Sequence, residues 1–373
     1  MIYFDNAATT YPKPRSVYRA VCEAMTVKGG NPGRSGHRLS REASAVIYSC
    51  REQIASLFGG LPENTVFTLN ATYAVNTALH ALVKPGGRVL ISTLDHNAVL
   101  RSVNAYGKYG LFEGLGSDAA ALSSLEAEMK SLPSAVVCCH ASNIIGRVLP
   151  VKEIGQLSKR YGVPFIIDAS QSAGRLDLTL EESGADAICA PGHKGLFGIQ
   201  GCGFVIFADK YRDTSRMLNT FVCGGNGVDS LDVRMPEYLP ERLEAGTMPT
   251  PAIASLEAGI KEVKALTLSE IAYREDRLGD RLRQGLSVIR GVMVYGGEYG
   301  GGTVLFNMEG KDSETVSELL DAQGICVRGG YHCCPLGHGS LGTRGGVRVS
   351  FSPFNTASEV DRMLTVLSRL SRQ

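Results

Sequence analysis

Five short apolar runs, each four or five residues long, constrain the fold more than any other feature of the sequence. They lie between segments with helical periodicity, at residues 66–69, 88–92, 135–139, 164–168 and 203–207. Apolar side chains at successive positions indicate a strand that is buried on both faces, because a half-exposed strand alternates apolar and polar residues. The pattern therefore predicts an α/β fold with a largely parallel sheet.

The character of the sequence changes near Pro251, where long charged helices begin. The elements expected from there on are helices within 251–287, near 313–323 and near 357–371, and strands at 303–308 and 345–351. With 373 residues, 44% of them apolar, the chain is long enough for two hydrophobic cores. We expect a large α/β domain over 15–250 and a smaller α+β domain formed by 1–14 and 251–373.

The charge balance points to a small-molecule ligand. The formal net charge is +1 and no long run of one sign occurs, so neither a nucleic-acid nor a membrane-surface partner is expected. The start of the chain has no basic segment followed by an apolar one, and no apolar stretch approaches 18 residues, which predicts a cytoplasmic protein. Several of the 10 cysteines fall in the apolar runs, where reduced cysteine behaves as a small hydrophobe.

Polar residues follow the predicted strands where they end. The carboxyl ends of parallel strands share one rim of the sheet, and ligands bind there. The residues expected at this rim are Thr72, His96, Asn143, Asp168 and Lys194. Lys194 lies in the stretch CAPGHKGLFG, where an apolar run leads into a glycine-rich turn. The turn either carries the lysine into a pocket or is an ordinary surface turn.

Pyridoxal phosphate is a ligand that would use each of these residue types. A lysine amine forms a Schiff base with an aldehyde, and a carboxylate keeps a pyridine nitrogen protonated. Lys194 and Asp168 would fill these two roles. A helix N-terminus with a hydroxyl such as that of Thr72 suits a phosphate, and His96 can stack on a ring. Taken alone, Asp168 and Gln171 are equally consistent with an ordinary turn at a strand end.

Ordered sequence blocks across nearly the whole chain carry a family resemblance. They are Tyr3-Phe4-Asp5-Asn6-Ala7-Ala8, Asn31-Pro32 with Arg34-Ser35-Gly36-His37, Asp95-His96, Ser142-Asn143 with Gly146, Asp168-Ala169-Ser170-Gln171, Gly192-His193-Lys194, Glu244-Ala245-Gly246-Thr247, Arg328-Gly329-Gly330-Tyr331-His332-Cys333 and Arg348-Val349-Ser350-Phe351 with Asn355-Thr356. The sequence resembles the class V aminotransferase-like branch of the fold-type I pyridoxal-phosphate enzymes. Within that branch it is similar to the group II cysteine desulfurases, which are related to selenocysteine lyases. The resemblance implies a mainly parallel large-domain sheet and a smaller α+β C-terminal domain.

The resemblance also implies roles for single residues. Lys194 would carry the Schiff base, Asp168 would pair with the pyridine nitrogen, and His96 would stack on the ring. The remaining cofactor contacts would be Gln171 and Asn143 near the ring hydroxyl, Ala71, Thr72 and His193 on the phosphate, and Thr247 on the cofactor of the neighbouring subunit in a homodimer. Pro191 departs from the family pattern, which has a serine or similar hydroxyl there; proline offers neither a hydroxyl nor an N–H.

The stretch RGGYHCCPLGHG, residues 328–339, bears on the reaction. A desulfurase needs an accessible cysteine whose thiolate attacks the substrate sulfur, and a nearby cation favours the thiolate. Cys333 follows His332 at the position where the resembling enzymes carry this cysteine, and Cys334 is the alternative if the register differs by one. These residues with His338 also look like part of a zinc site, but no separate CxxC pair completes one, so no metal is expected.

An arginine in a predicted strand suggests a binding site for an anion. Arg348 lies in the run GVRVSF, where a guanidinium requires a partner such as a carboxylate. The resemblance assigns it the substrate's α-carboxylate, with Arg328 and His37 near the same opening. A structural acid as the partner of Arg348 is the alternative.

These observations lead to one predicted activity and several alternatives. We expect conversion of L-cysteine to L-alanine with transfer of sulfur to Cys333 as a persulfide, and then to an acceptor protein. A selenocysteine lyase acting on L-selenocysteine, an aminotransferase and an epimerase share the fold, but the last two have no need of the thiol. A non-catalytic scaffold of the same fold is expected to lack Lys194 or Asp168, and both are present.

Overall fold

The computed structural model describes residues 1–33 and 36–372 of the chain, and within them seven strands form the larger sheet. The strand order is β2-β8-β7-β6-β5-β3-β4. The strands are β2 (Thr65–Thr68), β3 (Arg88–Ser92), β4 (Lys108–Phe112), β5 (Ala135–Cys139), β6 (Phe165–Asp168), β7 (Ala187–Pro191) and β8 (Gly203–Phe207). β8 pairs antiparallel with β2 and β7, whereas the pairs among β3 to β7 are parallel. The prediction of a largely parallel α/β sheet is confirmed.

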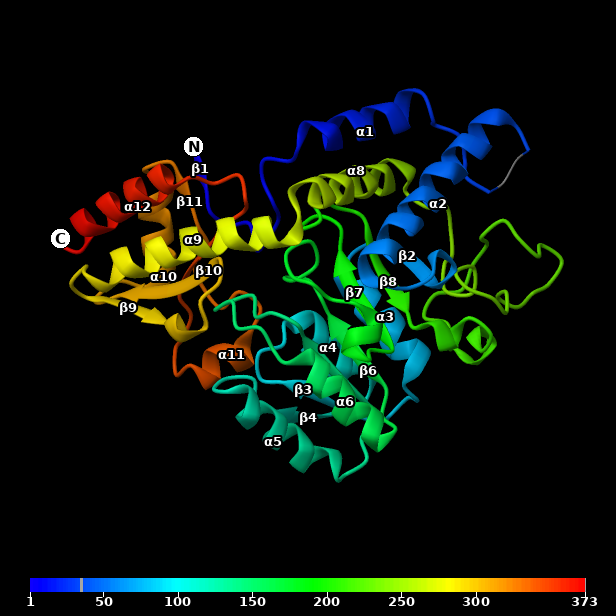
Figure 1. Ribbon diagram of the computed structural model, residues 1–373, viewed down its shortest axis with the longest axis horizontal. Coiled ribbons are helices and arrows are strands. Elements are labelled where there is room, and N and C mark those ends of the chain that lie inside the picture. Colours follow the sequence, from blue (N-terminus) through cyan, green and yellow to red (C-terminus); the bar gives the residue numbers. More distant parts are fainter. Residues whose placement is uncertain (34–35, 373) are drawn as a thin grey trace.

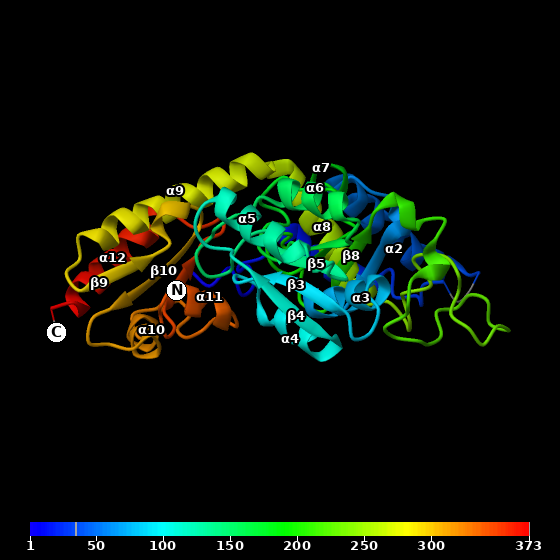
Figure 2. The same ribbon diagram turned by 90° about the horizontal axis from the view of Figure 1, so that it is seen from below.

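Helices cover both faces of this sheet, which explains the continuous apolar runs (Figures 1 and 2). Neighbouring residues of one strand enter different cores: Val136 packs in the core on one face and Val137 in the core on the other. The helices of this part are α1 (Arg15–Thr26), α2 (Arg38–Phe58), α3 (Ala71–Leu82), α4 (Asn97–Tyr106), α5 (Asp118–Met129), α6 (Val151–Tyr161), α7 (Leu180–Ser183) and α8 (Thr250–Leu266). Short 3-10 helices lie at η1 (Pro62–Asn64), η2 (Asp209–Tyr211) and η3 (Ser215–Met217).

Strand β4 was not predicted from the sequence, and its position explains why. It is the last strand of the sheet and pairs only with β3 among the described strands. Its residues alternate between exposed and buried over most of its length, as expected of an edge strand with one face in water. A search for continuous apolar runs therefore does not detect it.

A second sheet lies at the other end of the molecule (Figure 1). In the part of the chain that the structure describes, it has the order β12-β10-β9, and a separate parallel pair joins β1 to β11. The strands are β1 (Ile2–Tyr3), β9 (Val292–Tyr295), β10 (Thr303–Met308), β11 (Ile325–Cys326) and β12 (Val347–Ser350). The helices are α9 (Leu268–Ser287), η4 (Gly297–Tyr299), α10 (Ser313–Asp321), α11 (Pro335–Ser340) and α12 (Ala357–Leu370).

The two parts of the chain have separate hydrophobic cores. Ile2 and Phe4 pack with residues of α9, β10 and α12, so the N-terminus lies in the core of the smaller sheet. Helix α8, in contrast, packs Ile253 and Leu256 into a core of the larger sheet. It ends at Leu266, and the next residue, Thr267, has a positive φ of 69° and separates it from α9. The division at residue 250 remains a prediction.

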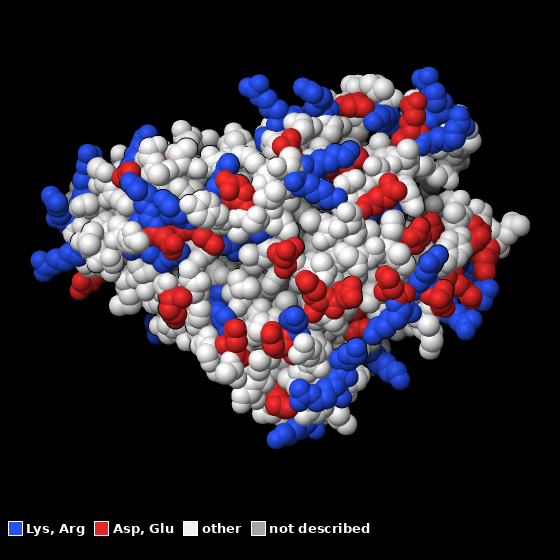
Figure 3. All heavy atoms as spheres, viewed as in Figure 1, with Lys and Arg blue, Asp and Glu red and all other residues white. Residues whose placement is uncertain are grey.

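The surface agrees with the absence of long charge runs in the sequence. On the face seen in Figure 3, basic and acidic side chains are interspersed rather than gathered by sign. Among the described helices, none combines the length and apolar character needed to cross a membrane.

Candidate active site

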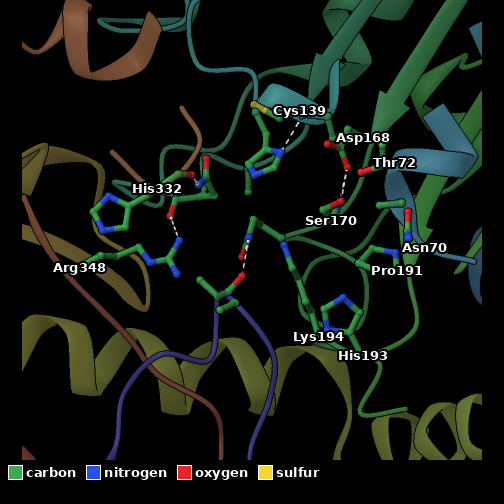
Figure 4. Close-up of a pocket in the computed structure, with 18 of the residues that line it drawn as sticks. Asn70, Thr72, Cys139, Asp168, Ser170, Pro191, His193, Lys194, His332 and Arg348 are labelled. Atoms are coloured by element: carbon green, nitrogen blue, oxygen red, sulfur yellow. Dashed lines mark hydrogen bonds between the residues drawn. The ribbon is translucent and has the colours of Figure 1, made fainter. Parts of the chain in front are cut away.

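A cavity of about 340 Å³ lies at the carboxyl ends of the parallel strands, between the larger sheet and the smaller part of the chain (Figure 4). Ten of the residues predicted from the sequence line it together: Ala71, Thr72, His96, Asn143, Asp168, Gln171, His193, Lys194, Arg328 and Arg348. Figure 4 shows Asp168 and Thr72 on the side opposite Arg348, with Lys194 entering between them. The cavity therefore has an acidic side, a basic side and an amine directed into it.

Lys194 lies in the turn after β7, and its glycine neighbours allow the turn to pack closely. A Cβ added to Gly195 would lie 2.4 Å from the carbonyl oxygen of Ala173, so no larger residue fits without movement. Loss of solvation lowers the pKa of the Lys194 amine to about 8, although the Asp168 carboxylate favours the charged form. About a tenth of this amine is therefore an unprotonated nucleophile at pH 7, far more than for an ordinary lysine.

The N-terminal segment holds the backbone around this lysine. Thr10 donates from its hydroxyl to the Lys194 carbonyl at 3.0 Å. The carbonyl of His193 accepts from Lys13 Nζ at 2.6 Å and from the Thr9 hydroxyl at 3.1 Å. A segment about 180 positions away in the sequence thus fixes the turn that carries the amine.

Two buried carboxylates organise the strand ends. Asp168 closes β6 and accepts hydrogen bonds from the amide, at 2.9 Å, and the hydroxyl of Ser170. Asp95 accepts from the amides of Ser92 at 2.6 Å and Cys139 at 2.7 Å, so it ties the end of β3 to the end of β5. Burial raises the pKa of Asp95 to about 7.

His96 follows Asp95 and caps helix α4. Its Nδ1 accepts a hydrogen bond from the amide of Ala98 at 2.9 Å. Burial and the Lys194 charge lower the pKa of His96 to about 4, so the ring is neutral at pH 7. Because Nδ1 is the acceptor, the neutral ring carries its proton on Nε2.

The end of the cavity near α3 suits an anion. Helix α3 begins at Ala71 and Thr72, where backbone N–H groups are not used by the helix. His193 adds a buried Nδ1 that has no hydrogen-bond partner among residues 1–33 and 36–372. Pro191 also lines this end and contributes no donor. The anion contacts available here are therefore the α3 N-terminus, the Thr72 hydroxyl and the His193 ring.

The two adjacent cysteines of the 328–339 stretch have different environments. Cys334 is fully buried and donates to the carbonyl of Leu94 at 3.3 Å; burial raises its thiol pKa to about 12. Cys333 is partly exposed, and its sulfur lies 3.9 Å from Nη2 of Arg328. Of the two, only Cys333 combines access with a cationic neighbour, which is what a reactive thiolate requires.

Arg348 has the acidic partner that the sequence left open as an alternative. Its guanidinium is buried, pairs with Asp5 at 2.6 Å and donates to the carbonyl of Asn143 at 3.1 Å. Its Nε is buried and has no hydrogen-bond partner among the residues described. The Asp5 contact spans 343 positions in the sequence, and nothing in the pattern of residues pointed to it.

Three predicted site residues do not line this cavity: His37, Thr247 and Cys333, whose sulfur is a neighbour of the cavity residue Arg328. His37 caps helix α2, where its ring accepts from the amide of Ser40 at 3.3 Å. Thr247 lines a separate cavity beside the buried ion pair between Arg51 and Glu244. Arg34 and Ser35 of the N-terminal block lie outside the described residues.

The cavity also contains residues that sequence reasoning did not assign. They are Ala7, Ala8, Asn70, Ala98, Cys139, Ala141, Ser170 and His332, together with Pro191, the position that departs from the family pattern. Ala7 and Ala8 belong to the first block of the resemblance, and Asn70 precedes a predicted helix start. The sequence around each of these three residues therefore contained a hint of a site. Cys139 had none, because it resembles any other residue of a buried strand.

Comparison with known proteins agrees with this architecture. Residues 2–363 match the family described as aminotransferase class-V. The chain belongs to the class-V aminotransferase family. The predicted fold and the family resemblance are both confirmed.

Relatives of this class-V chain align over nearly its whole length. A protein of Methanothermobacter thermautotrophicus named "Probable cysteine desulfurase" is 30% identical, and the alignment covers 99% of this chain and 94% of that protein. A protein of the same name from Pyrococcus abyssi is also 30% identical over 99% of this chain and 94% of its own length. The apo structure of a cysteine desulfurase from Thermococcus onnurineus NA1 aligns with a TM-score of 0.90 and 31% identity, covering 100% of this chain and 94% of that one.

Proposed function

We propose that the protein is a pyridoxal-phosphate-dependent cysteine desulfurase that converts L-cysteine to L-alanine and takes the sulfur onto Cys333 as a persulfide. The observation that carries the proposal is an accessible cysteine, 3.9 Å from Arg328, beside a cavity that contains both Lys194 and Asp168. The cysteine desulfurases among the relatives support the same reaction. A scaffold role gains no support, because the lysine and the carboxylate are both present.

The residues of the cavity fit pyridoxal phosphate. The unpartnered Nδ1 of His193 and the free N–H groups at the start of α3 offer donors to a phosphate. We propose Ala71, Thr72 and His193 for that role. The groups proposed for the ring are the Lys194 amine, the Asp168 carboxylate, the His96 imidazole, the Gln171 amide and the Asn143 amide.

When bound, pyridoxal phosphate supplies an electron sink that makes the α-proton of an amino acid acidic. Lys194 is suited to accept that proton and to return one, because its amine is partly unprotonated near neutral pH. Arg348 binds the α-carboxylate in this proposal, sharing its guanidinium with Asp5. His96 presents Nε2–H to the cavity and can donate a hydrogen bond there.

Cys333 performs the sulfur transfer. Its thiolate attacks the sulfur of the substrate, an S–S bond forms on the protein, and the C–S bond of the substrate breaks. The electron pair of that bond passes to the substrate carbon, which takes up a proton, so the balanced products are alanine and the Cys333 persulfide. Nη2 of Arg328 lies 3.9 Å from the Cys333 sulfur and can donate a hydrogen bond to it before the attack. Cys334 stays inert in its buried position.

A product assay tests the proposal. Incubation of the holoenzyme with L-cysteine and a reductant is expected to release alanine and sulfide in equal amounts, measured by chromatography and by sulfide derivatisation. A keto acid product would indicate an aminotransferase instead, and racemised cysteine an epimerase. A parallel assay with L-selenocysteine gives the preference between the two substrates.

The pKa of Lys194 predicts the pH dependence of its reaction with the cofactor. Only the free amine adds to an aldehyde, and an amine with a pKa of about 8 is about half unprotonated at pH 8, where an ordinary lysine is almost fully charged. Borohydride trapping of added pyridoxal phosphate on the apoprotein should therefore rise with pH and level off above about pH 9. Mass spectrometry of the Lys194 peptide measures the yield. A yield that still rises at pH 10, like that of exposed lysines in the same digest, would contradict the prediction.

We also propose a homodimer in which Thr247 reaches the partner's cofactor. Thr247 lies outside the cavity of its own chain, and Leu231 and Val233, earlier in the same irregular segment, are fully exposed apolar residues. His37 and Arg328 remain proposed contacts for the substrate. An acceptor protein for the sulfur and a cytoplasmic location remain predictions.

A further inference from the structure

A buried pair of histidines lies behind the loop that carries Cys333. His332 and His338 are 2% and 0% exposed, and their rings stack with centroids 5.5 Å apart and an interplanar angle of 22°. Nδ1 of His332 lies 3.3 Å from Nε2 of His338. Nε2 of His332 lies 3.0 Å from the carbonyl oxygen of Arg328. The pair thus links both ends of the 328–338 stretch.

The contacts fix which ring nitrogens carry protons. The carbonyl of Arg328 is only an acceptor, so Nε2 of His332 must donate to it. Burial lowers the pKa of both histidines, which keeps the rings neutral at pH 7. Nδ1 of neutral His332 is then an acceptor, and Nε2 of His338 must donate to it. His338 therefore donates to His332, and His332 donates to the Arg328 carbonyl.

The hydrogen bonds through the two histidines restrain a strained part of the backbone. His332 and Cys333 have φ angles of 51° and 54°, in the left-handed region that residues other than glycine rarely occupy. Such conformations persist only where the surroundings hold them. Asn143 donates to the His332 carbonyl at 2.8 Å, and the Asn97 amide donates to the Cys333 carbonyl at 2.7 Å. The ring of His332 adds the third restraint, and that restraint depends on His338.

We propose that His338 is a positioning residue, which acts through His332 to hold the sulfur of Cys333 beside the guanidinium of Arg328. The inference rests on the proposed function, in which Cys333 receives the sulfur. His338 does not line the cavity, so it has no direct contact with a ligand there. Without its donor, His332 Nδ1 is left buried without a partner, the ring is free to turn, and the loop relaxes from the left-handed conformation.

The test compares two variants that differ in the donor. His338→Gln keeps an N–H that can reach His332, whereas His338→Leu fills the space without a donor. The readout is the alkylation of Cys333 by iodoacetate relative to iodoacetamide in the holoenzyme, measured by mass spectrometry. The anionic reagent is favoured only while the sulfur lies beside Arg328, and the ratio cancels changes in general exposure. Exposed Cys22 of the same molecule is the internal standard.

In His338→Leu the reagent ratio at Cys333, divided by that at Cys22, should fall about fivefold, the effect of losing one partly exposed charge contact. In His338→Gln it should stay near the wild-type value. With L-cysteine, kcat should fall about tenfold in His338→Leu while KM changes little, because the substrate contacts are intact. An unchanged ratio in His338→Leu, or equal effects of leucine and glutamine, would overturn the inference.

Two further outcomes keep the tests separate. Should His338→Leu fail to fold, His338→Asn replaces it: the amide stays polar but is too short to reach His332, and the same fall in the ratio is expected. Should the wild type release no sulfide while the ratio still responds to His338, the proposed function fails and the positioning role is supported. A wild-type enzyme that releases sulfide with a ratio insensitive to His338 would support the proposed function and contradict the positioning role.

Discussion

Replacing Lys194 by alanine is expected to remove sulfide release and to abolish the visible absorbance of a lysine-bound cofactor. The loss of both the covalent link and the proton carrier should lower the rate by at least about 10²–10⁴-fold, the range of a single proton-transfer group. Sulfide production and the absorbance spectrum of the purified variant measure the two effects. Their combination is specific, because a change that only weakened folding would reduce the amount of enzyme without altering the spectrum of the folded fraction.

A matched control for this variant is Lys152→Ala, which removes an exposed lysine on helix α6 away from the cavity. It should leave the rate and the spectrum within about twofold of wild type, as expected of a surface substitution. Retention of the cofactor spectrum in Lys194→Ala would refute the assignment of the amine. It would direct attention to Lys13, the other lysine whose pKa burial lowers to about 8.

Replacing Cys333 by alanine should abolish sulfide release from L-cysteine, by at least about 100-fold, while the bound cofactor keeps its spectrum. The reason is that Cys333 takes the sulfur but does not hold the cofactor in the proposed mechanism. Sulfide and alanine assays, with persulfide detection on the Cys333 peptide of the wild type, measure the effect. Sulfide release that persists in Cys333→Ala would assign the nucleophile elsewhere.

Cys334→Ala is the natural control, because the two cysteines are adjacent and differ in burial. Removing the buried sulfur should lower the free energy of unfolding by about 1–3 kcal/mol, measured by denaturant titration, and leave sulfide release largely intact. Loss of activity in Cys334→Ala at full occupancy of the cofactor would reverse the assignment. L-Selenocysteine is unsuitable for this comparison, because a carbon–selenium bond breaks more readily than a carbon–sulfur bond.

Local sequence patterns predicted much of the fold because they report burial. The strands at 88–92, 135–139, 203–207 and 303–308 coincide with β3, β5, β8 and β10. In the folded protein, residues of these strands pack into hydrophobic cores on both faces. Edge strand β4 was not predicted, because one of its faces is exposed to solvent and its residues do not form a continuous apolar run. The strands β1 and β11 were not predicted because two residues are too few to show a periodicity.

The candidate site likewise has residues that the sequence predicted and contacts that only the structure shows. Residues at the ends of successive parallel strands were predicted to meet, because topology brings those ends to one rim, and Asp168, Asn143 and Lys194 line one cavity. The N-terminal segment meets the same cavity from far away in the sequence. Asp5 pairs with Arg348, and Thr10 holds the Lys194 carbonyl, through contacts that no local pattern encodes.

By itself, the sequence determined the class of fold, the family and the residue types available for chemistry, because periodicity and motif spacing are local properties of the chain. Only the tertiary structure decided which of two neighbouring thiols is buried, which acid neutralises Arg348 and which histidine supports the cysteine loop. The physical reason is that burial, pKa and hydrogen-bond pairing depend on groups that are distant in the sequence and adjacent only after folding.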